Sequence, residues 1–530
     1  MSTRRGERQT KSGAQHVSPK IRHPGNGDGD GNGNGNGKHI GHLSSGNGNG
    51  KSNGNGDPSW TGPAILGVKG QQGSRKPRIL LVLTEFPPRI GGMQTHALYL
   101  SRHLARRGYT VEVVTYQPAS LDERRALIDI DSHLPFPVRR VLSRLGYWHN
   151  LERLEALGRT FRPDLVYSST VFYGFLRDTL GIPVICRSVG NDVLRPWIAY
   201  PFHPGSRALS TPYVDDHLYK FFRRFDYPEI LEILFRQRRW ELMRDSAQRM
   251  HRIVANSSFT ANLLQEIGVR PEAIEILVGG VDAHRFTPPP HNHPRRWRQT
   301  LGLPQDAFIL TTACRLVAKK GIDFLLPSMP AIRRAIPNAH LLVIGEGRHG
   351  RRYRRLARRL GVNDAVTFIG RVEHEQIHEY YWASDVFVLA SRVQVDPTTG
   401  LRDAETMGRV LCEANAAGLT TVAARSGGIP SVIRHEENGL LFTPDDENDL
   451  VATLLRAKED LDLTSAMRKE GRRLAIEAFD WSVILTAHER YFARALGEDM
   501  VLSPPDSERI VEPIPFPSLI PEKDKFIQRA

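Results

Sequence analysis

The chain has 530 residues, a formal net charge of +14 at pH 7 and three cysteines. This length exceeds what one hydrophobic core usually supports and predicts two domains. The cysteines, Cys186, Cys314 and Cys412, are far apart and form no C-x-x-C pair, which argues against a disulfide framework or a zinc site and favours a reducing compartment. The positive charge suits an anionic partner (nucleic acid, acidic lipid or a phosphorylated substrate) without choosing among them.

The N-terminal segment, residues 1–75, is dominated by Gly and Asn repeats such as Gly31–Gly37. It has almost nothing apolar to bury, so we expect a disordered arm outside the folded domains. Its first residues lack the apolar core of a signal peptide, and no run in the chain approaches the roughly 20 apolar residues of a membrane span. These features predict a cytoplasmic protein.

From residue 76 the chain alternates short apolar runs with amphipathic stretches, which predicts parallel strands separated by helices. The strands expected before a Pro-rich linker, Thr287–Pro294, are Ile79–Leu83, Val111–Thr115, Asp164–Tyr167, Val184–Cys186, Ile253–Ala255 and Ile274–Leu277. Those expected after it are Ile309–Ala313, Leu341–Ile344, Val366–Ile369, Val386–Leu389 and Thr421–Ala424.

This repeated pattern predicts an α/β protein with two Rossmann-like, doubly wound domains, 76–288 and 289–480, facing each other across a cleft. Residues 481–500 are expected to form a C-terminal helix that returns to the first domain, and residues 501–530 an extended tail.

Two adjacent glycines, Gly91 and Gly92, separate the first expected strand from the first expected helix, Met93–Arg107. Glycines at this position allow the backbone to approach a phosphate or a sugar closely. A plain strand-to-helix turn explains this segment equally well when it is taken alone. Its glycine spacing fits neither a dinucleotide fingerprint nor a Walker loop.

Two cations, Arg315 and Lys320, follow the first expected strand of the second domain. Such a pair suits a diphosphate, because Arg can bind it bidentately and Lys supplies a mobile charge. The alternative is a solvated basic loop in an arginine-rich protein. We expect neither cation to sit in a core.

The most informative stretch runs from Glu405 to Glu413, two carboxylates eight residues apart with Gly408 between them. Gly408 would let backbone N–H groups approach a ligand, and the N-terminus of the following helix would favour a phosphate. If the whole stretch were helical, the carboxylates would lie roughly 12 Å apart, about the span between the two sugars of a nucleotide-sugar. Paired glutamates are also common on solvated helices, so this interpretation depends on its context.

Several motifs occur in the order and spacing typical of retaining GT-B glycosyltransferases. They are Gly91-Gly92, Arg315-x4-Lys320-Gly321, Gly345-Glu346-Gly347, Ala383–Ser391 and Glu405-x7-Glu413. The chain resembles the large family 4 group, which includes bacterial mannosyl- and glucosyltransferases and sucrose synthase. Ser426–Ile433 and Asn438–Phe442 resemble the carboxyl-terminal signature of the same group, and the resemblance covers roughly residues 77 to 497.

This resemblance implies a site for a nucleoside diphosphate (NDP)-hexose donor. Glu405 would bind the hexose hydroxyls and Glu413 the ribose of the nucleotide. Arg315 and Lys320 would neutralise the diphosphate, and the Gly92 backbone would contact it from the other domain. The backbone near Arg371 and Val372 would face the base.

The resemblance also implies that no cofactor is needed besides the donor co-substrate. The leaving phosphate would accept the proton, so no dedicated protein base is required. An Arg/Lys pair with a helix N-terminus can replace a metal ion in stabilising the leaving group, and we expect no metal. The D-x-D candidates for a metal are Asp28–Asp30, in the arm, and Asp129–Asp131.

The chain departs from this family in one place. Many relatives carry a His in a His-Gly-x-Asp stretch, where this chain has Val189 followed by Gly190, Asn191 and Asp192. Asn191 and Asp192 could line the acceptor site, and a capping or turn role is equally consistent.

Two further segments are rich in cations. Residues 197–240 combine aromatic and basic side chains and predict an insertion in the first domain, suited to a membrane interface or to internal packing. Arg351–Leu360 could be a nucleic-acid or lipid patch, but Leu356 and Leu360 favour an amphipathic helix that covers the second sheet.

We therefore predict a metal-independent, retaining glycosyltransferase that moves a hexose from an NDP-sugar to a glycan or lipid-linked acceptor in surface-polysaccharide or glycolipid biosynthesis. Peripheral membrane contact is expected and a nucleic-acid partner is not. A sugar-nucleotide epimerase or a phosphorylase on the same scaffold remains an alternative. A non-catalytic nucleic-acid-binding protein would explain the charge, but it would leave the paired glutamates without purpose.

Overall fold

The computed structural model describes residues 76–88, 91–118, 120–144, 146–196, 198, 201–202, 217, 229–289, 294–396 and 401–497. All of them belong to one unit of the chain, Gly73–Ala530. The predicted arm (1–75), the predicted tail (501–530) and most of the segment 197–228 lie outside the described residues.

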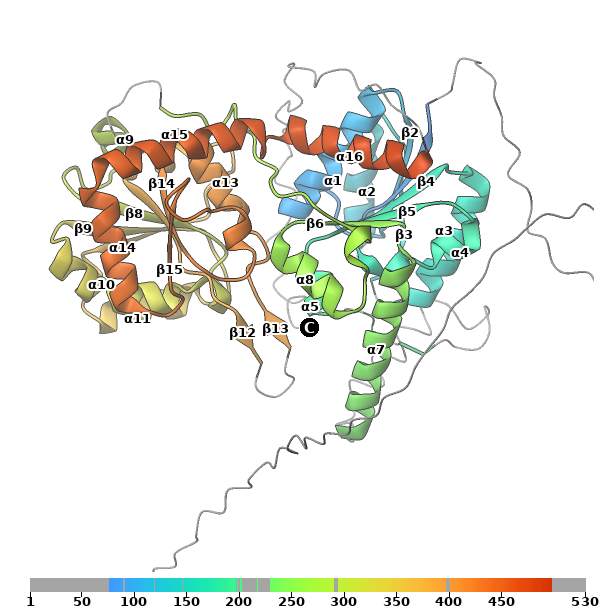
Figure 1. Ribbon diagram of the computed structural model, residues 1–530, viewed down its shortest axis with the longest axis horizontal. Coiled ribbons are helices and arrows are strands. Elements are labelled where there is room, and N and C mark those ends of the chain that lie inside the picture. Colours follow the sequence, from blue (N-terminus) through green and yellow to red (C-terminus); the bar gives the residue numbers. More distant parts are fainter. Residues whose placement is uncertain are drawn as a thin grey trace, which may run out of the picture. The chain divides into compact units, whose positions relative to one another are not determined.

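The first domain is built on a parallel sheet of seven strands (Figure 1). The strands are β1 (Arg78–Val82), β2 (Thr110–Tyr116), β3 (Val138–Leu142), β4 (Leu165–Ser168), β5 (Val184–Ser188), β6 (Arg252–Ala255) and β7 (Ile274–Ile276). Their order in the sheet is β3-β2-β1-β4-β5-β6-β7. Because the sheet grows outward in both directions from β1 and β4, it is doubly wound, with its topological switch point between these two strands.

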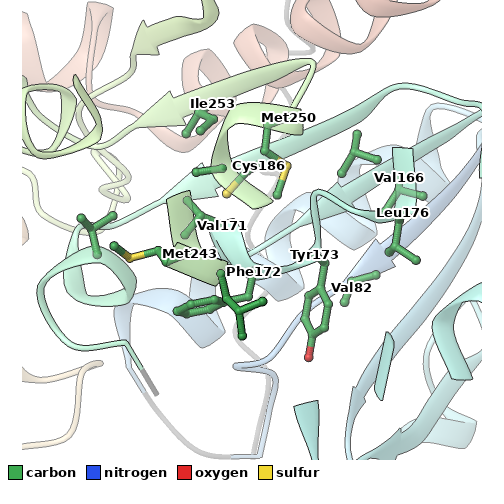
Figure 2. Packing of buried hydrophobic residues seen from close by; sticks show 14 of the residues in the cluster. Val82, Val166, Val171, Phe172, Tyr173, Leu176, Cys186, Met243, Met250 and Ile253 are labelled. Atoms are coloured by element: carbon green, nitrogen blue, oxygen red, sulfur yellow. The ribbon is translucent and has the colours of Figure 1, made fainter. Parts of the chain in front are cut away.

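Helices cover both faces of this sheet. They are α1 (Gly92–Arg106), α2 (Leu121–Ser132), α3 (Tyr147–Phe161), α4 (Leu176–Leu180), α5 (Asn191–Leu194), α7 (Glu229–Arg249) and α8 (Ser258–Glu266). Figure 2 shows one face, where Val82, Val166 and Cys186 of the strands pack with Phe172 and Met243. The alternation of strand side chains puts Ile79, Leu81 and Ile185 on the other face, where they pack against α1.

The second domain repeats the same plan. Its strands are β8 (Phe308–Ala313), β9 (Ala339–Ile344), β10 (Val366–Gly370), β11 (Val386–Leu389), β14 (Thr420–Ala424) and β15 (Leu440–Phe442). They are all parallel, in the order β10-β9-β8-β11-β14-β15. The switch point therefore lies between β8 and β11. The prediction of two doubly wound α/β domains is confirmed.

The helices of the second domain divide between the two faces of its sheet (Figure 1). They are α9 (Pro294–Thr300), α10 (Ile322–Ala335), α11 (Gly350–Arg359), α12 (Ile377–Trp382), α13 (Arg409–Ala416), α14 (Glu447–Glu459) and α15 (Leu461–Glu477). Side chains of α10, α11 and α14 share one core, and those of α13 and α15 share the other. In α11 the buried side chains are Tyr353 and Ala357, whereas Leu360, expected in the apolar stripe, is 37% exposed.

The last described helix, α16 (Trp481–Leu496), packs on the sheet of the first domain. Trp481 and Phe492 share a core with residues of β1 and α1. His103 and Arg107 both approach the Glu489 carboxylate at 3.3 Å. Among the helices described, none is long and apolar enough to cross a membrane.

Four of the described strands were not anticipated. Strand β3 reads as polar because it is an edge strand with two arginines and partly exposed side chains. Strand β15 has only three residues. A two-stranded antiparallel ribbon, β12 (Gln394–Val395) and β13 (Arg402–Asp403), precedes the Glu405 loop and is too short to show a period in the sequence.

Candidate active site

The candidate active site is built at the switch point of the second sheet. Arg315 and Lys320 follow the carboxyl end of β8, and Glu405 and Gly408 lie between β11 and the start of α13. Ligands of doubly wound sheets bind outside the carboxyl ends of the strands at this point. The topology thus brings together residues that are far apart in the sequence.

Lys320 and Glu405 form an ion pair, with Nζ donating to Oε2, and their side chains are only 11% and 15% exposed. The neighbouring Lys319, which the sequence analysis did not single out, donates to Asp403 Oδ1 and to the Ala404 carbonyl, each at 2.9 Å. The expectation that Lys320 stays out of a core is therefore wrong. A single 3-10 turn, Ala318–Lys320, directs both lysine side chains inward toward the segment that precedes α13.

Glu405 is held in its charged form. Burial alone would raise its pKa, but the charge of Lys320, its hydrogen bond, the charge of Lys319 and the backbone N–H of Gly408 together lower it. An ionised carboxylate only accepts hydrogen bonds. Glu405 is therefore suited to receive hydroxyl groups, as in a sugar.

The Gly427-Gly428 pair fixes the backbone that carries Glu405. The N–H of Gly428 donates to the Glu405 carbonyl at 2.8 Å. A Cβ on Gly427 would lie far inside contact distance of that carbonyl oxygen, and one on Gly428 would do the same to the Thr406 carbonyl. Only glycine permits this approach, which gives the glycines of the Ser426–Ile433 motif a structural role.

Glu413 has a different environment. Helix α13 starts at Arg409, after Gly408 with φ of 88°, so the stretch from Glu405 is not helical throughout and the distance worked out for a continuous helix does not apply. The Tyr381 hydroxyl donates to Glu413 Oε2 at 3.4 Å, and Arg409 Nε lies 3.5 Å from Oε1. Burial raises the pKa of Glu413, opposed by the charge of Arg409 and the Tyr381 hydrogen bond.

The other predicted donor-site residues of this domain lie around the same strand ends. Arg315 is exposed, and within the described chain no carboxylate pairs with it. Its loop is fixed by a hydrogen bond of 2.9 Å from the Leu316 N–H to the Glu346 carbonyl. Arg371 is also exposed, with Nε 3.6 Å from Glu373, and Val372 packs against the core.

The first domain contributes the loops after β1, β5 and β6. Gly91 precedes α1, and a Cβ on Gly92 would lie 3.5 Å from Arg409 Nη1 of the second domain. Asn256 Nδ2 lies 3.4 Å from Thr406 Oγ1, beside Glu405. These contacts bring the glycine loop of one domain to the carboxylates of the other.

Further contacts between the domains were not predicted either. The hydroxyls of Ser258 and Ser431 are 2.8 Å apart, and Arg195 Nη2 lies 2.8 Å from Asp403 Oδ2. A local sequence pattern cannot predict such pairs, because the two residues of each pair belong to different domains. Arg409 lies within the stretch from Glu405 to Glu413, and the signal that could have identified it is a cation directly after Gly408.

The predicted acceptor residues occupy the start of α5. Asp192 accepts hydrogen bonds from Ser188 Oγ at 2.8 Å and from the Val171 N–H at 3.1 Å, and burial raises its pKa. It therefore braces the loop after β5. The neighbouring Asn191 is exposed.

The D-x-D candidate within the described residues lies in α2. Asp131 is engaged by Arg140, whose Nε and Nη2 donate to its two oxygens at 2.8 and 2.9 Å. Across the described ranges, no three His, Cys, Asp or Glu side chains gather in a way that could hold a metal ion. Asp28–Asp30 lies outside those ranges.

Two protein-family models match the chain, one to each domain. The first is Glycosyltransferase Family 4, over residues 90–285, and the second is Glycosyl transferases group 1, over residues 294–474. Together they span nearly all of the two sheets described above.

Individual relatives match at moderate sequence identity, and some of them over only part of their length. A GDP-mannose-dependent alpha-(1-6)-phosphatidylinositol monomannoside mannosyltransferase of Mycobacterium tuberculosis is 34% identical over 232 residues, 43% of this chain and 58% of the relative. Mannosylfructose-phosphate synthase of Agrobacterium fabrum is 27% identical over 446 residues, 77% of this chain and 90% of the relative. The crystal structure of Anabaena HepE in complex with UDP superposes with a TM-score of 0.58 at 19% identity, covering 79% of this chain and all of that one, which shows a shared fold.

Proposed function

The chain belongs to the GT-B glycosyltransferases of the family 4 type, and from this premise we propose that it moves a hexose from an NDP-sugar to a glycan or lipid-linked acceptor with retention of anomeric configuration. The observation that carries the proposal is the charged Glu405, held by Lys320 and by the Gly408 N–H at the start of α13. A largely buried, ionised carboxylate and the exposed cation Arg315, both outside the strand ends of the second sheet, suit a ligand that offers hydroxyls next to a diphosphate.

Each residue then has a role in the transfer. Glu405 accepts hydrogen bonds from the hexose and orients its anomeric carbon, and Glu413 accepts those of the ribose. Arg315 and the N-terminus of α13 stabilise the charge that develops on the diphosphate, and Lys320 adds to the field through its pair with Glu405. The backbone of Gly92 contacts the donor from the first domain.

The chemical step needs no base from the protein. The acceptor hydroxyl oxygen forms its bond to the anomeric carbon on the face from which the diphosphate departs. The bond between that carbon and the phosphate oxygen breaks, and its electrons stay on the oxygen, which takes the hydroxyl proton. Preorganised cations and a helix N-terminus supply the charge stabilisation, so we propose that the reaction proceeds without a metal ion.

A mannosyl donor is the first candidate to test, because both relatives are named for the mannosyl group and the name of one specifies GDP-mannose. The acceptor is proposed to be a glycan or a lipid-linked intermediate of glycolipid or surface-polysaccharide assembly, reached by peripheral contact with a membrane. The name of the first relative, which acts on a phosphatidylinositol mannoside, supports this acceptor class.

A thermal-shift panel of GDP-, UDP- and ADP-sugars tests the donor class. A ligand at 100 times its dissociation constant should stabilise the protein by about 2.7 kcal/mol. Turnover with the best donor is then measured in excess EDTA, and the anomeric configuration of the product is read by NMR. Stabilisation by no donor contradicts the proposal, an inverted product contradicts retention, and loss of activity on chelation contradicts metal independence.

A further inference from the structure

Arg409 is a cation of the candidate site to which the proposed function gives no role. It is the first residue of α13, and its side chain is 26% exposed. Its Nε lies 3.5 Å from Glu413 Oε1, and its Nη1 lies 3.5 Å from the place of a Cβ on Gly92. The guanidinium therefore lies between the proposed ribose-binding carboxylate of the second domain and the glycine loop of the first.

This guanidinium has donors to spare. It carries five N–H groups in a planar fork, yet in the described chain its side chain makes only the long contact with Glu413 and no hydrogen bond. In the described chain, no carboxylate other than Glu413 lies within 4.0 Å of its guanidinium. The pKa of His374 is lowered to about 4 by burial and by the charge of Arg409, so this side chain is neutral, and Arg285 is itself a cation, 3.7 Å from Asp282.

An anion fits this arrangement best. An arginine fork can bind a phosphate bidentately. The first turn of α13 contains no acidic residue, and the N-terminus of a helix attracts negative charge. Lys320, which was expected to face the diphosphate, already has Glu405 as a close partner. Glu405 neutralises much of the positive charge that Lys320 brings to the site, and Arg409 can supply positive charge in its place.

We propose that Arg409 binds the diphosphate of the donor from the side of Gly92, leaving Glu413 to the ribose hydroxyls as the donor enters. This inference rests on the proposed function and adds a donor-recognising residue to it. In the donor-free chain, Arg409 offsets part of the cost of burying the Glu413 carboxylate. With donor bound, the ribose hydroxyls take over that task and the guanidinium is free for the phosphates.

The test compares two ligands that differ only in their phosphates. Arg409→Met and Arg409→Lys are titrated in a calorimeter with the nucleoside diphosphate that binds the wild type and with its parent nucleoside at high concentration. Arg409→Met should bind NDP about 10- to 100-fold more weakly than the wild type, because it loses a charged hydrogen-bonding partner of the phosphates. Nucleoside binding should change by less than about twofold, because a nucleoside lacks the phosphates that would contact Arg409. Arg409→Lys should lie between the wild type and Arg409→Met, because it keeps the charge and loses the fork.

The matched control is Arg358→Met, which removes the same charge from an exposed position of α11 and should leave both affinities unchanged. Equal NDP affinity in Arg409→Met and the wild type would overturn the inference and leave the proposed function standing. Equal losses for NDP and nucleoside would also overturn it, because Arg409 would then act only through Glu413. A wild-type protein that binds no NDP would overturn both the inference and the proposed function. If Arg409→Met fails to fold, Arg409→Lys decides by the same comparison.

Discussion

Replacing Lys320 by Met should destabilise the second domain, and the cause should be the Glu405 carboxylate. Met keeps most of the apolar length of Lys but removes the charge, so Glu405 stays buried and loses its closest counter-ion. Removing one partner of a buried ion pair costs about 3–5 kcal/mol. Lys319 and the Gly408 N–H still act on Glu405. We therefore expect a loss of about 3 kcal/mol, at the lower end of that range.

Urea unfolding of Lys320→Met, Glu405→Gln and the double variant measures this effect as a double-mutant cycle. The double variant lacks both charges of the pair, so neither is left without its partner. It should therefore be more stable than the sum of the two single losses predicts, with an interaction free energy of about 1–3 kcal/mol. Lys469→Met is the control, because Lys469 is exposed and its replacement should change the free energy of unfolding by less than about 0.5 kcal/mol. Losses that simply add in the double variant would refute the reasoning, since the two side chains would then be energetically independent.

Further predictions concern the donor site. Arg315→Ala should raise the activation free energy by about 2–4 kcal/mol in steady-state kinetics while leaving urea unfolding unchanged, because the side chain is exposed. Glu413→Gln should weaken calorimetric binding of NDP and NDP-sugar alike, whereas Glu405→Gln should lower turnover and leave NDP binding nearly intact; equal losses in both would contradict this division. Gly428→Ala should lower turnover by displacing the Glu405 loop, and wild-type kinetics in that variant would show that the loop does not need the glycine. The folded pKa of Glu405 is lowered, so its contribution to stability is complete above its unfolded pKa and is lost as pH falls through the folded one. The stability difference between wild type and Glu405→Gln should accordingly shrink on acidification, and an unchanged difference would contradict the charged state.

The sequence predicted the fold well because parallel strands buried on both faces are continuous apolar runs. All eleven strands expected from such runs overlap strands of the two sheets. Edge strand β3 was missed for the same reason, since a strand with one neighbour and partly exposed side chains has no need of an apolar run. The order of the strands in each sheet is a tertiary property, and the sequence suggested it only through the repeated strand–helix pattern.

The candidate site was predicted in its residue types but not in its pairings. Lys320 looked like a free cation at a loop, yet it has Glu405 as its partner 85 positions later in the chain. The residues around Lys320 in the sequence do not indicate which residue so far along the chain will be its partner. The same holds for Asp192, whose bonds to Ser188 and Val171 depend on how the loop after β5 folds back on the sheet.

The two glutamates show why the pairings matter for function. They stand on one short stretch, Glu413 buried and Glu405 with a side chain only 15% exposed, yet the pKa of Glu405 is lowered and that of Glu413 is raised. The difference follows from their partners, because Glu405 has a lysine and a backbone N–H in direct contact, whereas the closest cation to Glu413 is an arginine 3.5 Å away. A carboxylate with a permanent partner can hold a sugar in one orientation through repeated turnovers. A carboxylate with a loosely held partner gains more from the hydroxyls of an arriving ligand, since they replace a poor contact rather than a good one. This asymmetry fits an orienting role for Glu405 and a nucleotide-binding role for Glu413.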